Sequence, residues 1–154
     1  MPEVKEIRRY ADFIRKKIKN KEILNIKLLK GRYKKKPFDN YSLIRKNMPL
    51  KCLDVKTKGK LLYIIFEDDF YLFVAHGLYG GWCYLNNKFE FSDNLKIYSK
   101  FFSKDKIEAY IRNSLNHLNV EFITNNGSLY FYDQLSFGSF ILYDNEEEFN
   151  KKLN

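Results

Sequence analysis

A proline and a glutamate stand directly after the initiator methionine, at Pro2 and Glu3. Removal of Met1 would leave Pro2 with a free secondary amine, whose pKa is that of an α-amino group, about 8. Such an amine can attack a sugar aldehyde carbon and form an iminium adduct, which divides one difficult displacement into easier steps. The neighbouring Glu3 carboxyl group could carry the proton that this reaction moves. These residue types predict covalent chemistry by the N-terminal amine.

The same two residues also suit the first turn of any helix. The missing N–H of a proline costs nothing there, and a carboxylate stabilises the positive end of the helix dipole. Apolar residues recur at helical spacing among charged residues, at Ile7, Phe13, Ile14 and Ile18. This spacing predicts an amphipathic helix over residues 3–19. Taken alone, the segment favours a structural role for Pro2 and Glu3 over a catalytic one.

The elements that must position this helix are mostly strands. Alternation of apolar and polar residues predicts strands over 23–29, 53–57, 61–66 and 71–75. A short helix is predicted over 39–46, before Pro49. The three strands after residue 52 suggest an antiparallel meander, because only short turns separate them.

A β-hairpin is the clearest local prediction. Val120, Phe122 and Thr124 alternate into Asn126-Gly127, and residues 129–133 alternate out of it. Residues 104–118 carry a helical stripe, and residues 146–148 would open a terminal helix or fray. The predicted fold class is α+β: a two-layer antiparallel β-sandwich flanked by the N-terminal helix and the inserted helix.

Composition limits the classes of binding partner and the cellular compartments that we expect for this chain. At 154 residues the chain is expected to form one domain, and its net charge of +9 favours a polyanion such as nucleic acid or an acidic membrane face. Biased coding composition would give a similar charge. Two distant cysteines and two histidines predict no metal site and no cofactor. Without a signal peptide or an apolar run long enough to cross a membrane, we expect an intracellular protein of the cytoplasm or nucleus, with no membrane partner.

Four separated segments resemble, in the same order, one family of DNA-repair enzymes. They are residues 1–7 (MPEVKEI), 55–62 (VKTKGKLL), 76–80 (HGLYG) and 132–138 (YDQLSFG). Their order and spread over nearly the whole chain are more specific than any one of them. The chain resembles the N-terminal catalytic domain of the formamidopyrimidine-DNA glycosylase and endonuclease VIII family.

This resemblance implies a DNA glycosylase with abasic-site lyase activity, acting in base-excision repair of oxidised bases. Pro2 would attack the sugar carbon and displace the base, and Glu3 would assist by proton transfer. Glu6 would support the same site from the next helical turn. Lys60 would place a positive charge against the phosphate beside the attacked sugar. Elimination from the iminium would then nick the strand.

The resemblance also implies a set of DNA-binding residues on separate turns and loops. Leu78 would fill the void left by a flipped base, and Phe137 would stack at the opposite strand. Lys58, Lys60 and Tyr79 complete this set. The N-terminus, Glu3, Glu6 and Lys60 are expected to gather at one end of a groove. Each of these residues also has an ordinary structural explanation, as a solvated lysine or a core or turn side chain.

Two departures from the family pattern affect the expected activity. The family usually carries one or two arginines where Leu135 and Ser136 stand here. Family members also continue into a helical domain and often a zinc finger, so residues 1–154 would correspond to the catalytic half with the second half absent. Because DNA affinity scales with the number of neutralised phosphates, damaged duplex DNA would be bound weakly unless a separate chain supplies this clamp.

Three alternatives stay open at this point. The chain could be a non-catalytic damaged-DNA-binding or relic domain, or one half of a split glycosylase. It could also be an unrelated basic, aromatic-rich interaction protein. Convergence of Pro2, Glu3 and Lys60 in the tertiary structure would argue against the last of these.

Overall fold

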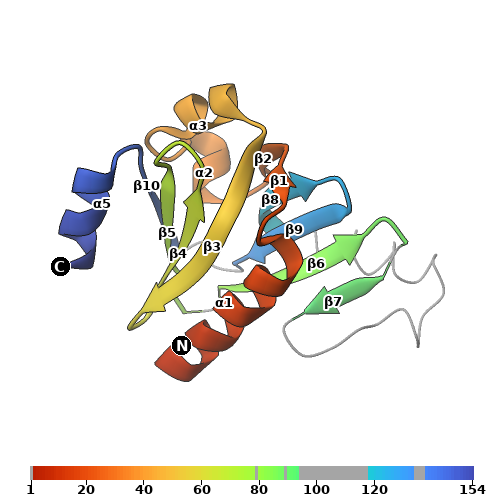
Figure 1. The fold of residues 1–154 in the computed structure, drawn as a ribbon. Coiled ribbons are helices and arrows are strands. Elements are labelled where there is room, and N and C mark those ends of the chain that lie inside the picture. The colour runs from red at the N-terminus through yellow and green to blue at the C-terminus, as the bar shows by residue number, and fades with distance from the viewer. Residues whose placement is uncertain (1, 79, 89, 94–117, 134–137) are drawn as a thin grey trace.

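Two antiparallel sheets and a long N-terminal helix make up the fold (Figure 1). The computed structural model describes residues 2–78, 80–88, 90–93, 118–133 and 138–154. Each sheet has five strands, and buried side chains from both sheets share one hydrophobic core. The predicted two-layer antiparallel α+β sandwich is therefore confirmed.

The first sheet has the strand order β1-β3-β4-β5-β10. Its strands are β1 (Glu22–Ile23), β3 (Leu50–Lys58), β4 (Leu61–Phe66), β5 (Tyr71–Ala75) and β10 (Ser139–Tyr143). β3, β4 and β5 form the predicted meander. β10 was not predicted; it pairs with β5 and forms the edge of the sheet.

The second sheet has the strand order β2-β8-β9-β6-β7. Its strands are β2 (Asn25–Leu28), β8 (Leu118–Thr124), β9 (Gly127–Tyr132), β6 (Gly81–Asn86) and β7 (Phe91–Asp93). β8 and β9 are the predicted hairpin. The single strand predicted over 23–29 is wrong: the chain changes sheet at Leu24, so β1 and β2 belong to different layers.

Three of the shorter helices complete the described chain: α2 (Arg32–Lys35), α3 (Tyr41–Asn47) and α5 (Glu146–Leu153). α3 confirms the helix predicted before Pro49, whereas α2 was not predicted. The inserted helix predicted over 104–118 lies outside the described residues except for its last position, where Leu118 instead begins β8. No helix among the described residues is long and apolar enough to span a membrane.

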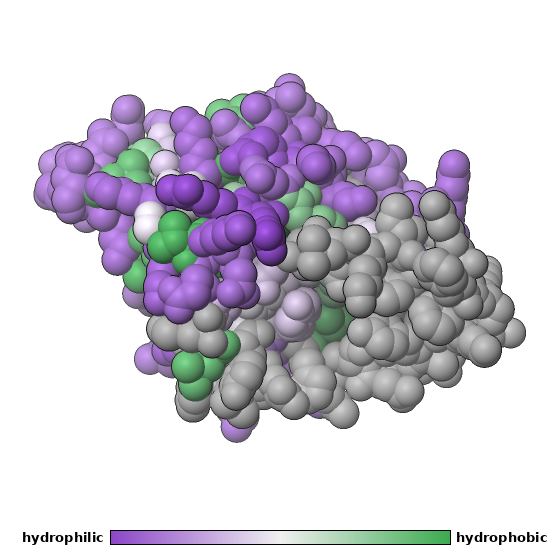
Figure 2. Space-filling view, turned by 90° about the horizontal axis from the view of Figure 1, so that it is seen from below, coloured by the Kyte–Doolittle hydropathy of each residue, from purple (hydrophilic) through white to green (hydrophobic). Residues whose placement is uncertain are grey.

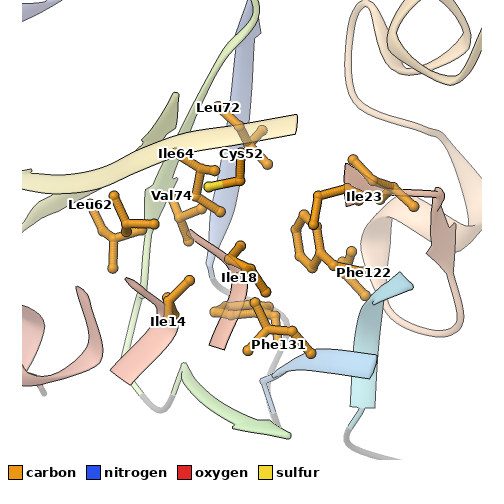
Figure 3. Close-up of a cluster of buried hydrophobic side chains, with 14 of the residues drawn as sticks. Ile14, Ile18, Ile23, Cys52, Leu62, Ile64, Leu72, Val74, Phe122 and Phe131 are labelled. Carbon is orange, nitrogen blue, oxygen red and sulfur yellow. The ribbon is translucent and has the colours of Figure 1, made fainter. Parts of the chain in front are cut away.

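Helix α1 (Val4–Ile18) confirms the predicted N-terminal helix and lies across the opening between the two sheets (Figure 1). It contacts β3 and β4 of one sheet and β6 and β9 of the other. Ile14 and Ile18 point into the core, where they meet side chains of both sheets such as Leu62 and Phe131 (Figure 3). Burial of this apolar stripe fixes the helix, and with it the N-terminus, relative to the strands.

A charged cluster also ties α1 to β3. Arg15 Nε donates to Asp54 Oδ1 at 3.1 Å, the Val55 N–H donates to the same oxygen at 2.8 Å, and Lys19 Nζ lies 3.7 Å away. Partial burial alone would raise the pKa of Asp54. The Val55 N–H, Arg15 and Lys19 outweigh that effect and hold the pKa of this carboxyl below its ordinary value of 3.8.

Replacing Asp54 by asparagine should therefore lower the free energy of unfolding by about 1 kcal/mol at neutral pH, discounted for partial exposure. A carboxyl group whose folded pKa is depressed stabilises above its unfolded pKa and loses that contribution as pH falls through the folded value. The difference between the wild type and Asp54→Asn in urea unfolding should accordingly shrink below pH about 4. Asp12→Asn is the control, since Asp12 is exposed and pairs with Arg15 from within the same helix. Equal losses in the two variants would contradict the assignment.

Helix α5 covers the outer face of the first sheet, the side away from α1 and the core (Figure 1). Phe149 stacks on Tyr71 with ring centroids 4.0 Å apart, and Leu153 packs against the same aromatic cluster. Asn145 caps the helix, because its side chain accepts the Glu148 N–H at 2.8 Å. The prediction that residues 146–148 open a terminal helix is confirmed.

Candidate active site

Strand register brings the ends of several strands to one end of the sandwich. Leu61 pairs with Ala75, and Ala75 pairs with Ser139. Lys60 precedes the first of these residues and Gly138 precedes the last, so both lie at the same end of the sheet. Residues 76–78 leave from this end as well.

The N-terminus of α1 lies beside the β3–β4 turn at this end (Figure 1). Lys60 Nζ is 3.5 Å from Glu3 Oε2, and both side chains are about half exposed or more. Gly59 makes this position possible for Lys60, because its φ of +58° is in the left-handed region that residues with a β-carbon rarely adopt. Pro2, one residue before Glu3, is buried. The structure thus brings together residues 57 positions apart in the chain, Glu3 and Lys60.

The other predicted site residues are placed less closely. Glu6 is exposed on the first turn of α1. Lys58 donates from Nζ to the Leu153 carbonyl of α5, so its amine is directed to the outer face of the sheet. Leu78 is 42% exposed, similar to Leu53 at 43%, so its side chain is accessible for contact. Tyr79 and Phe137 lie outside the described residues.

Two hydrogen bonds at this end join residues that flank short segments of the chain. The Gly80 N–H donates to the His76 carbonyl at 3.0 Å, and the Gly138 N–H donates to Asp133 Oδ2 at 2.6 Å. A β-carbon at Gly80 would overlap the His76 carbonyl oxygen and the Phe131 ring, and one at Gly138 would overlap Asp133 Oδ2 and pack tightly against the same ring. Both glycines therefore rest on one buried aromatic ring. The sequence indicates that these glycines are turn residues. It does not indicate the role of Phe131, because the alternation of apolar and polar residues along β9 predicts only an ordinary core position for it.

His76 is 3% exposed. Its Nε2 accepts the Trp82 Nε1–H at 2.7 Å, and its ring stacks on Tyr10 at 5.3 Å between centroids. Because Nε2 is an acceptor, the proton of the neutral ring is on Nδ1, which has no hydrogen-bond partner among the described residues. Burial lowers the pKa of His76 to about 4, so the ring is neutral at physiological pH.

Acidification should destabilise the fold through His76. In the unfolded chain this ring takes up a proton near its ordinary pKa, whereas the folded protein resists protonation until pH about 4. The unfolded state therefore binds more protons between these values, and the free energy of unfolding should fall by about 3 kcal/mol across them. Protonation at Nε2 would also remove the acceptor for Trp82.

Chemical unfolding at a series of pH values, compared between wild type and His76→Phe, measures this contribution. The variant should be less stable at neutral pH, because Trp82 loses its acceptor, yet its stability should depend less on pH. Parallel pH profiles for the two proteins would show that His76 does not titrate as its burial requires.

The surface of this end is largely polar. Figure 2 looks onto it, and hydrophilic side chains cover most of the area not drawn in grey, with small hydrophobic patches between them. Among the residues that the structure describes, no group of three or more His, Cys, Asp or Glu side chains is placed to hold a metal ion. The predicted site residues that the structure brings into contact at this end are the Glu3 carboxylate and the Lys60 ammonium group.

The N-terminal helix and the β3–β4 turn that carries Lys60 thus lie together at one end of a two-sheet α+β sandwich. The chain belongs to the family described as formamidopyrimidine-DNA glycosylase N-terminal domain, which matches residues 1–140. The family resemblance expected from the four sequence segments is thereby confirmed. A comparison with curated proteins found no match.

Solved structures of this family share the fold. A complex of an inhibited LlFpg with N7-benzyl-Fapy-dG DNA has a TM-score of 0.70 and 17% identity, covering 99% of this chain and 47% of that one. MutM in complex with carbocyclic 8-oxo-G DNA has a TM-score of 0.70 and 17% identity, covering 99% and 49%. The Lactococcus lactis Fpg bound to DNA with an abasic site has a TM-score of 0.69 and 16% identity, covering 98% and 46%. The chain spans about half the length of these proteins.

Proposed function

We propose that this chain is a DNA glycosylase domain with abasic-site lyase activity, in which the Pro2 amine of the mature chain is the nucleophile. The observation that carries the proposal is the 3.5 Å contact between Glu3 and Lys60 at the N-terminus of α1. An exposed ion pair by itself is common on protein surfaces, so the support comes from its place beside the N-terminal residue. Convergence of the carboxylate and the ammonium group beside Pro2 supports a reactive centre.

A carboxylate beside the amine supplies a proton acceptor for the proposed attack. Glu3, the residue after Pro2 and an ion-pair partner of Lys60, can accept the proton that the amine loses on attack.

The reaction on an abasic site balances without a cofactor. The amine nitrogen bonds to the aldehyde carbon, and the carbonyl oxygen takes up protons and leaves as water, which gives an iminium. Loss of a proton from the adjacent sugar carbon then expels the phosphate at the next carbon and cuts the strand. Lys60 would stabilise the negative charge of that phosphate. Water finally hydrolyses the adduct and frees Pro2.

Excision of an oxidised base needs one step more, because the nucleotide must first leave the duplex. Leu78 supports this step, since it is exposed in a short segment whose flanking residues are joined by the Gly80–His76 hydrogen bond. An apolar side chain held in this way can fill the space of the extruded nucleotide and offset part of the extrusion cost of a few kcal/mol.

The proposal is tested by trapping the intermediate. The full chain with Met1 removed is incubated at low salt with duplex DNA that carries one abasic site, in the presence of borohydride. Reduction of an iminium would leave a stable protein–DNA cross-link, visible as a slower band on a denaturing gel. DNA without the abasic site is the control. No cross-link at high protein concentration would make the chain a non-catalytic or relic domain.

A further inference from the structure

The segment of residues 31–40 is fixed along the free edge of β10. Side chains of this segment form hydrogen bonds with backbone groups of alternate residues on that edge. Arg32 Nη1 donates to the Gly138 carbonyl at 3.5 Å, the Phe140 N–H donates to Tyr33 Oη at 2.8 Å, and Asn40 Nδ2 donates to the Leu142 carbonyl at 2.9 Å. Phe38 is buried and packs against Tyr33 and Phe140. The aromatic side of the segment therefore anchors α2 to the sheet edge.

The opposite side of the segment carries a concentration of positive charge. Lys34, Lys35 and Lys36 are consecutive and exposed, and within the described residues none of the three forms an ion pair. Arg32 is also exposed and lies over the Tyr33 ring at 5.0 Å. Four cations within five residues repel one another in the free protein, so this arrangement is stabilised when a polyanion binds to it.

A hollow lies between this charged segment and β10. Its volume is about 450 Å³, and its wall contains the cations Arg32 and Lys36 and the aromatic rings of Tyr33 and Phe38. Asp39 is the one acidic side chain among the residues that line it. The hollow can thus admit a phosphate and part of its sugar between two cationic side chains. We call Arg32, Lys34, Lys35 and Lys36 the α2 cluster.

The position of the α2 cluster points to DNA as the polyanion. Of the four side chains, that of Arg32 reaches the Gly138 carbonyl, at the end of the sandwich where Lys60 and Leu78 also lie. We infer that the α2 cluster is a second phosphate-binding surface, which holds the duplex backbone beside Gly138 while Lys60 holds it near the reacting sugar. This inference rests on the proposed function and extends its DNA contact across the width of the sandwich.

The salt dependence of binding tests the inference. Each phosphate contact steepens the slope of log affinity against log salt concentration by about 0.9 on duplex DNA. The triple variant Lys34→Ala, Lys35→Ala, Lys36→Ala should therefore have a slope shallower by about 3 and should bind more weakly at low salt. The probe is a fluorescent duplex with one reduced abasic site, followed by anisotropy over a range of sodium chloride concentrations.

A charge-matched control uses three lysines outside the α2 cluster. Lys21, Lys46 and Lys51 lie near β1 and the start of β3, at the end of the sheet away from Lys60. Their triple alanine variant removes the same charge and should change the slope by less than one contact. Equal flattening in both triple variants would mean a diffuse effect of net charge and would overturn the inference.

Two further outcomes are decisive. If the lysines only protect the β10 edge from pairing with other chains, their removal would cause aggregation with an unchanged slope, and the inference would fail. If affinity for single-stranded RNA falls while affinity for the duplex does not, the α2 cluster binds RNA instead. Borohydride trapping of each protein tests the proposed function separately. If the triple variant forms the adduct and its salt slope equals that of the wild type, only the role of the α2 cluster is rejected. If the wild type forms no adduct, the proposed function is rejected.

A neutral methylphosphonate, placed at successive positions of the duplex, locates the contact. At the phosphate that the α2 cluster binds, this replacement should weaken wild-type binding and have no further effect on the Lys34, Lys35, Lys36 variant. Additive losses at every position would show that these lysines and the DNA phosphates do not interact directly.

Discussion

Blocking the N-terminal amine should abolish the borohydride-stable adduct with abasic DNA. An uncleaved extension before Pro2 converts the secondary amine into an amide, which has no nucleophilic nitrogen, while it leaves Glu3, Lys60 and the rest of the chain intact. The adduct yield is compared by denaturing gel electrophoresis with that of the chain whose Met1 has been removed. Digestion with trypsin should place the DNA on the peptide of residues 2–5.

The Pro2→Gly variant separates the amine from the ring of the proline. Adduct formation and nicking should fall to the level of protein-free DNA, because the secondary amine of proline, the proposed nucleophile, is lost. Should this variant form as much adduct as the wild type, a primary amine carries the reaction, either that of Lys60 or the new terminal glycine. Acetylation of the variant's N-terminus decides between them, and an adduct that survives acetylation would overturn the N-terminal assignment.

Replacing Lys60 by glutamine should slow adduct formation and strand cleavage by about 10²-fold at saturating DNA. The expected loss is large because the ammonium group serves twice: it holds the Glu3 carboxylate at 3.5 Å and places positive charge near the departing phosphate. Single-turnover rates at saturation report the chemical step and exclude weaker binding as the cause. Lys60→Arg keeps the charge and should recover part of the rate.

Lys56→Gln is the matched control for this measurement. Lys56 is an exposed lysine of β3, the strand that leads into the same turn, and its loss removes an equal charge from the protein. Its rate should stay within about threefold of the wild type, as expected for a surface charge outside the reactive centre. A comparable loss in the two variants would assign the effect to net charge and remove Lys60 from the proposed mechanism.

Local patterns in the sequence were sufficient to predict most of the elements. The apolar stripe of Ile7, Ile14 and Ile18 identifies α1, and the alternation around Asn126-Gly127 identifies the β8–β9 hairpin, because both signals depend on residues close together in the chain. The family was also accessible from four short segments. The predicted site residues Pro2, Glu3 and Lys60 came from the same segments.

Sheet membership depended on contacts that no local pattern encodes. Residues 23–29 satisfy the alternation of one strand, yet β1 pairs with β3 and β2 pairs with β8. β10 joins β5 as an edge strand only because the core presents an unpaired edge there. Such pairings depend on which apolar side chains of neighbouring strands are buried together. The sequence of one strand does not contain this information.

By itself, the sequence determined most of the element types, the family and the chemical character of the residues at the N-terminus, since these depend on residue identity and short spacing. Only the tertiary structure decided which of those residues meet. The pairing of Leu61 with Ala75 and of Ala75 with Ser139 carries Lys60, Leu78 and Gly138 to one end of the sandwich. The same fold directs the Lys58 amine to the outer face of the first sheet, although only one glycine separates Lys58 from Lys60. The physical reason is that successive side chains along a strand alternate between faces and a turn redirects them again, so proximity in sequence does not set proximity in space.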